Sequence, residues 1–376
     1  MSQEANLLTS LFDNKKYVYK INNTLYIIPR KRLRNRGCFV STILDVAEKA
    51  KVSIATVSRA LNNQPGCSEE TRKKVMRIAQ ELGYEPNEVA RSLINKKTNT
   101  IGVIIPEISS LLSSEFINGI DAIAKQESSN LIVTYTKSNI VSTEENLKML
   151  HEKRVDGIIF VSEILRKEYY DYIKRNNIPC VLLSTKSAEY ASVPYVKVDD
   201  YDASYAATNY LIKMGHKKIG LISGSSADPI AGNPRIDGYK KAILENLNKV
   251  VEERQIVSGN GFGFDDGRDN FIQLMKQFPE LTAIFCVSDE MAIGAISAAY
   301  RLGIKIPEDV SIMGYDNLKI SEMSVPPLTT TAQPLVKMAE KATEILFKII
   351  NKKADDVHSI IMPYQIIERD SVKKIK

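Results

Sequence analysis

From residue 100 onward, short apolar runs alternate with amphipathic stretches, and this alternation restricts the fold more than any other feature of the sequence. The apolar runs are rich in Val and Ile, as expected for strands that are buried on both faces. The amphipathic stretches have the apolar spacing of helices. Together they predict parallel sheets covered by helices on both faces, an α/β fold. The expected strands are TIGVIIP, LIVTYT, DGIIFV, CVLLS, KKIGLISG, TAIFCVS and VSIMGYD, and the expected helices lie near 114–128, 143–153, 201–214, 235–247, 289–302 and 335–350.

A chain of 376 residues is too long for a single compact core. The alternating part alone exceeds one α/β layer, so we expect two subdomains with a cleft between them. Ligands of open parallel sheets bind at the carboxyl ends of the strands. The residues expected at these ends are SE (162–163), ST (184–185), SDE (288–290) and YDN (315–317).

The segment 41–85 has a different pattern and predicts three short helices. Thr42, Ser53 and Ser68 are candidate N-caps, and Gly83 follows the last helix as a C-terminal stop. In the second helix, Val57 and Leu61 are expected to point inward. The outward residues are mostly small or polar, which suits a helix that enters the DNA major groove, where an Arg can pair with a guanine edge. These outward residues are Ile54, Ala55, Ser58, Arg59 and Asn62.

Charge is distributed unevenly along the chain. Residues 1–98 contain 18 Lys and Arg against 9 Asp and Glu, a net charge of +9, whereas residues 99–376 contain 33 against 36, a net charge of −3. A basic first part is expected when only that part meets a polyanion. Ordinary solvated surface charge is the alternative explanation.

Residues 1–40 match neither pattern and include the basic run RKRLRNR, from Arg30 to Arg36. We expect a disordered leader, or a start site assigned too far upstream. The alternative is a basic arm that adds non-specific phosphate contacts.

Other classes of protein lack their signatures. The glycine-rich SGNGFGFDDG lacks the third glycine of a dinucleotide fingerprint, and no phosphate-binding loop or GxSxG nucleophile motif occurs. The three histidines and four cysteines lack metal-ligand spacing. No membrane-length apolar run or secretory signal is recognised. We therefore expect a cytoplasmic protein that is not an enzyme and has no cofactor, metal or membrane partner.

The segment ILDVAEKAKVSIATVSRALNN, followed by SEETRKKVMRIAQELGYEPNEVARSL, resembles the DNA-binding head of the LacI/GalR family of bacterial repressors. The resemblance continues through VDGIIF, PRIDGYKKAI, SDEMAIGAISAAYRLGIKIPEDVSIMGYDN and PPLTTTAQP. It implies a repressor of carbohydrate metabolism genes. Its parts would be a helix-turn-helix head at 41–85, a hinge helix and linker at 86–98, and an effector-binding and dimerisation body at 99–376. The body would resemble periplasmic sugar-binding proteins, although a transport protein of that kind would need a signal peptide and would lack the head.

The resemblance also implies how DNA is bound. Ile54 and Ala55 occupy base-contacting positions, with Arg59 one turn later, and Leu93 falls where a leucine is wedged into the minor groove. A homodimer would bind a pseudo-palindromic operator. The C-terminal residues contain no leucine heptad of the kind that joins dimers into tetramers, which favours the dimer. The full expected DNA-binding set is Ser53, Ile54, Ala55, Thr56, Ser58, Arg59, Asn62, Arg91 and Leu93.

For the effector, the resemblance implies that Arg235 and Asp316 clamp the ligand, and we expect them to face each other across the cleft. Phe262 would stack on a sugar face. Two departures are SLLSSEF, where the family often has aromatic walls, and Ser184, where a more strongly polar residue is common. A sugar, a sugar phosphate and a phosphorylated protein corepressor therefore stay open, as does induction against corepression. The expected effector-binding set is Arg235, Asp316, Phe262, Ser288, Ser184, Ser162 and Leu112.

Overall fold

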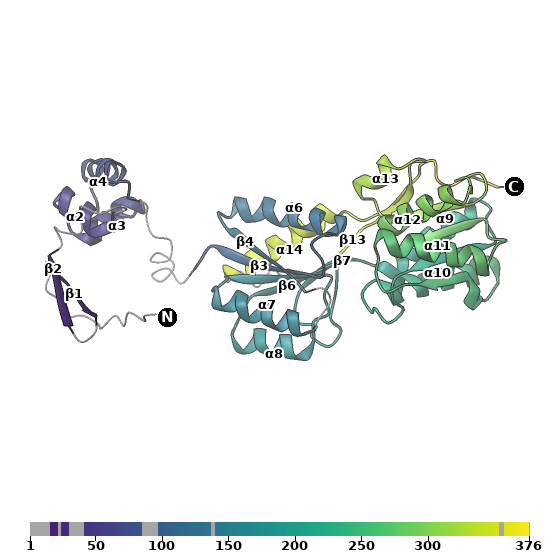
Figure 1. The fold of residues 1–376 in the computed structure, drawn as a ribbon, viewed down its shortest axis with the longest axis horizontal. Coiled ribbons are helices and arrows are strands. Elements are labelled where there is room, and N and C mark those ends of the chain that lie inside the picture. The colour runs from purple at the N-terminus through teal and green to yellow at the C-terminus, as the bar shows by residue number, and fades with distance from the viewer. Residues whose placement is uncertain are drawn as a thin grey trace. The chain divides into compact units, whose positions relative to one another are not determined.

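The computed structural model describes residues 16–21, 24–29, 41–84, 97–136, 140–352 and 357–375. The chain forms two compact units, Met1–Asn95 and Lys96–Lys376 (Figure 1). No helix among the described residues is both long and apolar enough to cross a membrane.

The head contains the three predicted helices, α2 (Ile43–Ala50), α3 (Ile54–Leu61) and α4 (Glu69–Glu81). The predicted N-caps Thr42, Ser53 and Ser68 each accept a backbone N–H three residues later. Lys51 adopts a left-handed conformation that ends α2 and turns the chain into α3. The three helices enclose a small core around Val46, Val57 and Val75, all fully buried. Local capping signals were therefore sufficient to predict this part of the fold.

Part of the leader differs from the expectation of disorder. Strands β1 (Lys16–Ile21) and β2 (Thr24–Pro29) form an antiparallel hairpin in which residue 21 pairs with residue 24. Their sequences, KYVYKI and TLYIIP, are rich in aromatic and β-branched residues, which favour strands. The basic run Arg30 to Arg36 lies outside the described residues.

The second unit is built around two six-stranded sheets. Each sheet defines one subdomain. The first sheet has the order β13-β7-β6-β5-β3-β4 and all its strand pairs are parallel. The second has the order β14-β12-β11-β10-β8-β9 and is parallel except for the β12–β14 pair. The strands of the first sheet are β3 (Thr100–Ile105), β4 (Asn130–Tyr135), β5 (Gly157–Val161), β6 (Cys180–Leu183), β7 (Tyr195–Val198) and β13 (Ile360–Met362); those of the second are β8 (Ile219–Ser223), β9 (Ile256–Ser258), β10 (Ala283–Cys286), β11 (Ser311–Asp316), β12 (Thr329–Ala332) and β14 (Gln365–Ile367).

Helices cover both faces of each sheet. In the first subdomain, α6 packs against α14, and α7 and α8 lie on the opposite face (Figure 1). In the second subdomain, α9 packs with α10 and α11 packs with α12. The helices of the first subdomain are α6 (Leu111–Gln126), α7 (Ile140–Glu152), α8 (Lys167–Arg175) and α14 (Leu335–Ile350); those of the second are α9 (Asp200–Lys213), α10 (Gly232–Leu247), the short 3₁₀ helix η1 (Glu253–Gln255), α11 (Phe264–Gln277), α12 (Asp289–Arg301) and α13 (Lys319–Met323).

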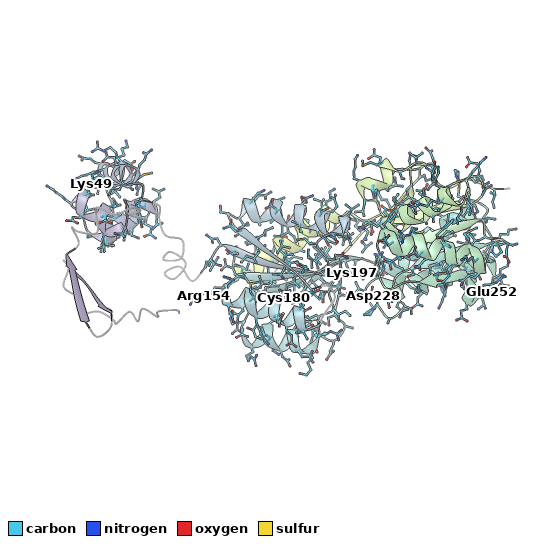
Figure 2. The ribbon with its side chains drawn as sticks, viewed as in Figure 1. Lys49, Arg154, Cys180, Lys197, Asp228 and Glu252 are labelled. Carbon is cyan, nitrogen blue, oxygen red and sulfur yellow. The ribbon has the colours of Figure 1, made fainter. Side chains whose placement is uncertain are left out.

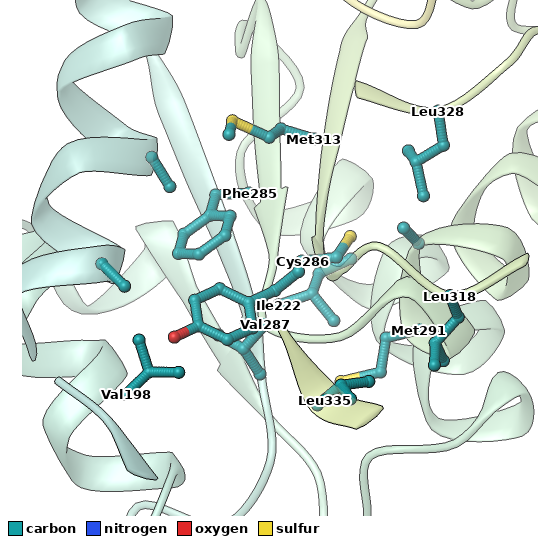
Figure 3. Close-up of a cluster of buried hydrophobic side chains, with 14 of the residues drawn as sticks. Val198, Ile222, Phe285, Cys286, Val287, Met291, Met313, Leu318, Leu328 and Leu335 are labelled. Atoms are coloured by element: carbon teal, nitrogen blue, oxygen red, sulfur yellow. The ribbon is translucent and has the colours of Figure 1, made fainter. Parts of the chain in front are cut away.

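The chain passes between the two subdomains three times: from β7 to α9, from β12 to α14, and from β13 to β14. Apolar side chains that flank the first two crossovers belong to a core cluster shared with the second sheet. In Figure 3, Val198 and Leu335 lie in the same cluster as Val287 and Met291. Each subdomain is therefore assembled from separate stretches of sequence, which the alternating pattern did not predict.

Candidate functional site

The outer face of α3 is exposed, as predicted. Ile54 has 46% of its surface exposed, an unusual state for a large apolar side chain, and Ala55 beside it is also exposed. Arg59 is exposed, and its guanidinium has no hydrogen bond or ion pair with a described residue. Val57 is fully buried and Leu61 is half-buried against the same small core. The surface is therefore presented on a helix whose inner face is anchored.

The polar residues of α3 hold the helix ends. The Ser53 hydroxyl accepts the Thr56 N–H at 3.1 Å and contacts the Thr56 hydroxyl at 2.9 Å. At the other end, the Asn62 amide donates to the Ser58 carbonyl at 2.9 Å. These hydrogen bonds hold the polar side chains in position at the helix ends, which suits contacts to a phosphate backbone. The remaining predicted DNA-binding residues, Arg91 and Leu93, lie outside the described residues.

In the second subdomain, Arg235 is part of a buried charge network. Its Nε and one terminal nitrogen donate to the Asp200 carboxylate at 3.0 and 2.8 Å, and the other terminal nitrogen donates to the Val287 carbonyl. The guanidinium also stacks on the Tyr315 ring at 3.8 Å from its centroid. The second oxygen of Asp200 accepts Lys197 Nζ at 2.9 Å. Two buried cations thus share one buried carboxylate.

The expectation that Arg235 and Asp316 face each other across a cleft is wrong. Arg235 lies in α10 and Asp316 ends β11, and both belong to the second subdomain. Arg235 is 6% exposed and Asp316 is 3% exposed. The partners of Arg235 all come from the second subdomain, so its guanidinium is bonded within that subdomain and does not point towards the first one.

Asp316 has its own partner at the second crossover. The Gln333 amide donates to its carboxylate at 2.7 Å. Burial raises the pKa of Asp316 to about 7, although Arg235 and the Gln333 amide both lower it. The backbone of Asp316 has a φ of 112°, which is strained for a residue with a side chain. Such strain is common at ligand sites.

Phe262 and Ser288 contact each other directly. The Ser288 hydroxyl donates to the Phe262 carbonyl at 2.7 Å and accepts the Met291 N–H at 3.1 Å, so it caps α12. The Phe262 ring packs on Gly224, where a Cβ would lie only 2.4 Å from the ring. Ser288 therefore has a structural task in addition to any ligand contact.

The first subdomain places Ser162 and Ser184 directly after neighbouring strands, β5 and β6. Both residues have left-handed backbones, with φ of 48° and 58°, and both are half-buried. Their hydroxyls make no hydrogen bond to a described residue, so they are available to a ligand. Leu112, in contrast, packs against the apolar core. Beside Ser162, burial raises the pKa of Glu163, while hydrogen bonds from Thr143 and Thr136 lower it.

A cavity of about 450 Å³ lies near this network but is not lined by Arg235 or Asp316. Its walls come from α6, α13, the start of α14 and Arg369. It meets the network at Gln333, which lines it and also bonds Asp316. Of the predicted effector residues, Arg235, Asp316 and Ser288 are buried in this arrangement, whereas the others are half-buried.

Three residues of the network were missed by sequence reasoning: Lys197, Asp200 and Gln333. Lys197, labelled in Figure 2, lies where the chain leaves the first sheet for the second. A lysine inside the apolar strand YVKV, followed closely by DD, was a usable signal, because a buried cation requires an anionic partner. Gln333 carried no such signal.

Comparisons with known proteins agree with this architecture. Residues 42–87 match the family of bacterial regulatory proteins of the lacI type, and residues 208–372 match a periplasmic binding protein-like domain. Catabolite control protein A of Priestia megaterium is 38% identical over 332 residues, which cover 88% of this chain and 99% of that protein.

Two solved structures have the same fold. The lac repressor dimer bound to operator and the anti-inducer ONPF has a TM-score of 0.79 at 25% identity, covering 89% of this chain and all of that one. The complex of the transcriptional regulator CelR with cellobiose has a TM-score of 0.67 at 26% identity, covering 88% and 99%. With an exposed α3 on a three-helix head, a two-subdomain body and similarity over nearly the whole relative, this chain belongs to the lacI family of bacterial transcriptional regulators.

Proposed function

We propose that the protein represses carbohydrate metabolism genes as a homodimer that binds a pseudo-palindromic operator through two copies of α3. The observation that carries the proposal is Arg59: an exposed guanidinium without a hydrogen bond or ion pair to any described residue, on a helix anchored by Val57 and capped by Ser53. A free Arg on a rigid helix can pair bidentately with a guanine edge. The lac repressor dimer, which shares this fold, binds operator DNA in its solved structure.

Roles within the head follow from position. Ile54 and Ala55, at the start of α3, contact base edges together with Arg59. Ser53, Thr56, Ser58 and Asn62 contact phosphates or flanking bases. Arg91 and Leu93, which lie outside the described residues, extend the proposed DNA contact through the hinge and linker at 86–98, and Leu93 enters the minor groove. The head is 41–85 and the effector-binding and dimerisation body is 99–376. Since bacterial operators lie in the cytoplasm, we place the protein there.

In vitro selection with the full-length chain and random duplexes tests DNA binding, since it should enrich a two-fold symmetric site. Replacing Arg59 by Ala should then weaken binding to that site by about 1–3 kcal/mol, and binding to random DNA by much less. Arg77→Ala is the control, because Arg77 is an exposed arginine of α4 that pairs with Glu81 at 3.6 Å. Equal losses on selected and random DNA would contradict a base-contacting role for Arg59.

For the body, we propose a sugar or sugar-phosphate effector that binds between the subdomains and changes their angle. Support comes from the hydroxyls of Ser162 and Ser184, which make no hydrogen bond to a described residue and can bind ligand hydroxyls, and from the strained backbone at Asp316. Phe262 provides an aromatic face, and Arg235 keeps N–H groups beyond those bonded to Asp200 and Val287. Ser288 follows strand β10, and Leu112 lies in the first turn of α6, which follows β3. The relative in complex with cellobiose has this fold.

The second candidate is a global catabolite regulator whose corepressor is a phosphorylated protein. It is favoured by the 38% identity to catabolite control protein A. Thermal-shift measurements of the full chain against sugars, sugar phosphates and phosphorylated proteins distinguish the two, because a ligand that binds the folded state raises the melting temperature. Loss of a small-molecule signal in Ser162→Ala and Ser184→Ala would locate the effector at the strand ends. A signal only with a phosphorylated protein would favour the second candidate.

A further inference from the structure

Helix α6 begins without a cap of its own. Its N-cap residue, Ser110, makes no capping bond to the helix, and the first turn contains no acidic residue. At the third helical position, where a capping acid commonly lies, Ser113 instead donates its hydroxyl to the Glu107 carbonyl at 2.7 Å. Since the first N–H groups of a helix have no partner within the helix, α6 requires an acceptor from elsewhere.

Glu290 provides that acceptor from the other subdomain. One oxygen of its carboxylate accepts the Leu111 N–H at 2.9 Å and the Ser110 hydroxyl at 3.1 Å. Glu290 itself lies in the first turn of α12. Its negative charge is therefore beside the N-termini of two helices, where it is stabilised by both helix dipoles. The contact joins residues that are about 180 positions apart in sequence.

The residues before Glu290 fix its position in the second subdomain. The fully buried carboxylate of Asp289 accepts the Leu318 N–H at 2.7 Å and the Thr330 hydroxyl at 2.6 Å. Ser288 is bonded to the Phe262 carbonyl. The first turn of α12 is thus held on both sides, so a movement of α6 relative to the second sheet must break the Glu290 contact rather than carry Glu290 along.

We propose that Glu290 is a positioning residue that sets the angle between the two subdomains by capping α6 from the opposite subdomain. The inference rests on the proposed function in one respect, because that function takes the angle between the subdomains as the quantity that an effector changes. Helix α6 directly follows β3, the first strand of the body, so a change in this angle moves α6 relative to α12. The contact holds the arrangement described here, and its loss lets the subdomains separate.

The first test is amide hydrogen exchange of the full-length chain at Leu111. Glu290→Ala should accelerate exchange at this amide about tenfold, the size expected for a lost N-terminal cap. Glu290→Gln keeps an acceptor oxygen and should restore most of the protection. The matched control is Glu322→Gln, which removes an exposed charge paired with Lys319 within the same subdomain. Unchanged exchange in Glu290→Ala overturns the proposal.

The second test asks whether the Glu290 contact sets the angle between the subdomains or only caps the end of α6. Spin labels at Glu127 and Lys305, both exposed and in different subdomains, report the distance between the subdomains by pulsed EPR, on a background in which Cys38 and Cys67 are replaced by Ser. Glu290→Ala should broaden the distance distribution, and Glu290→Gln should narrow it again. A distribution that stays the same in Glu290→Ala overturns the positioning role even if Leu111 exchanges faster.

The third test concerns DNA. On a selected operator, Glu290→Ala should change the affinity at least threefold while Glu322→Gln leaves it unchanged, and equal affinities in all three chains contradict the coupling. A wild-type chain that selects no operator overturns the proposed function instead. The EPR measurement needs no DNA, so in that case it still tests whether Glu290 sets the angle between the subdomains.

Discussion

Arg59 in the head and Arg235 in the body have the same side chain in opposite surroundings. Arg59 is exposed and has no bonded partner among the described residues, whereas Arg235 is buried, bonded to Asp200 and Val287, and stacked on Tyr315. An exposed guanidinium costs the fold little and is available to a large polyanion. A buried one requires partners that offset its desolvation. Arg59 thus lies free of described partners on the surface of the head, whereas Arg235 belongs to an internal network of the body.

The largest expected difference between the two regions is in stability. Replacing Arg235 by Ala leaves Asp200 with one cation fewer and should lower the free energy of unfolding by about 3–5 kcal/mol in urea denaturation. Lys241→Ala, in the same helix but paired with Glu245 at the surface, is the control and should change little. A loss below about 1 kcal/mol for Arg235→Ala would show that the network is not essential to folding.

The second difference is in pH dependence. The pKa of Asp316 is about 7 in the folded protein, well above its ordinary value of 3.8. The folded state therefore holds a proton that the unfolded state has released, so this group's stabilising contribution is present below pH 4 and is lost as the pH rises towards 7. The full change corresponds to about 4 kcal/mol.

Asp316→Asn removes this titration and keeps an oxygen that can accept the Gln333 amide. Its unfolding free energy relative to the wild type should therefore rise between pH 4 and pH 8, as measured by urea denaturation at each pH. If the two chains show parallel pH profiles, Asp316 is ionised in the folded protein throughout.

A third comparison uses two helix caps. Ser53 in the head and Ser288 in the body each accept an N–H at 3.1 Å, but of the two only Ser288 also donates to a backbone carbonyl, that of Phe262, at 2.7 Å. Ser53→Ala should cost about 1 kcal/mol, and Ser288→Ala about 2 kcal/mol, because it also leaves the Phe262 carbonyl without a donor. Thermal unfolding of both variants measures the difference. Equal losses would mean that water reaches the Phe262 carbonyl.

The smallest effect should come from the ion pair between α2 and α4. Lys49 Nζ lies 2.8 Å from the Glu81 carboxylate, close to the distance of the Lys197–Asp200 pair, but both side chains are 47% exposed. Water screens an exposed pair, so Lys49→Met should leave the melting curve of the full chain nearly unchanged. Lys197→Met, which breaks the buried pair, is the comparison and should lower the melting temperature clearly. A similar decrease in both variants would contradict the role assigned to burial.

The elements that could be predicted are those whose signals are local. The three head helices have a capping serine or threonine and a regular apolar stripe, and the long strands have continuous apolar runs, so both were predicted. The elements that were not predicted are strands β1, β2, β7, β9, β12, β13 and β14 and helices α8, η1, α11 and α13. The short strand β12 has the sequence TTTA, with a threonine bonded to Asp289, and its polar residues resemble those of a loop until their partners are known.

By itself, the sequence determined the fold class, the exposed face of α3 and the family, because capping, periodicity and motif spacing act between residues close in the chain. The tertiary structure alone decided that Arg235 and Asp316 share one subdomain, that Lys197 and Arg235 share Asp200, and that Glu290 caps α6. The Arg235–Asp200 and Ser110–Glu290 contacts join residues that are 35 and 180 positions apart in the chain. The energy of a buried charge depends on every group around it, and no local pattern carries that information.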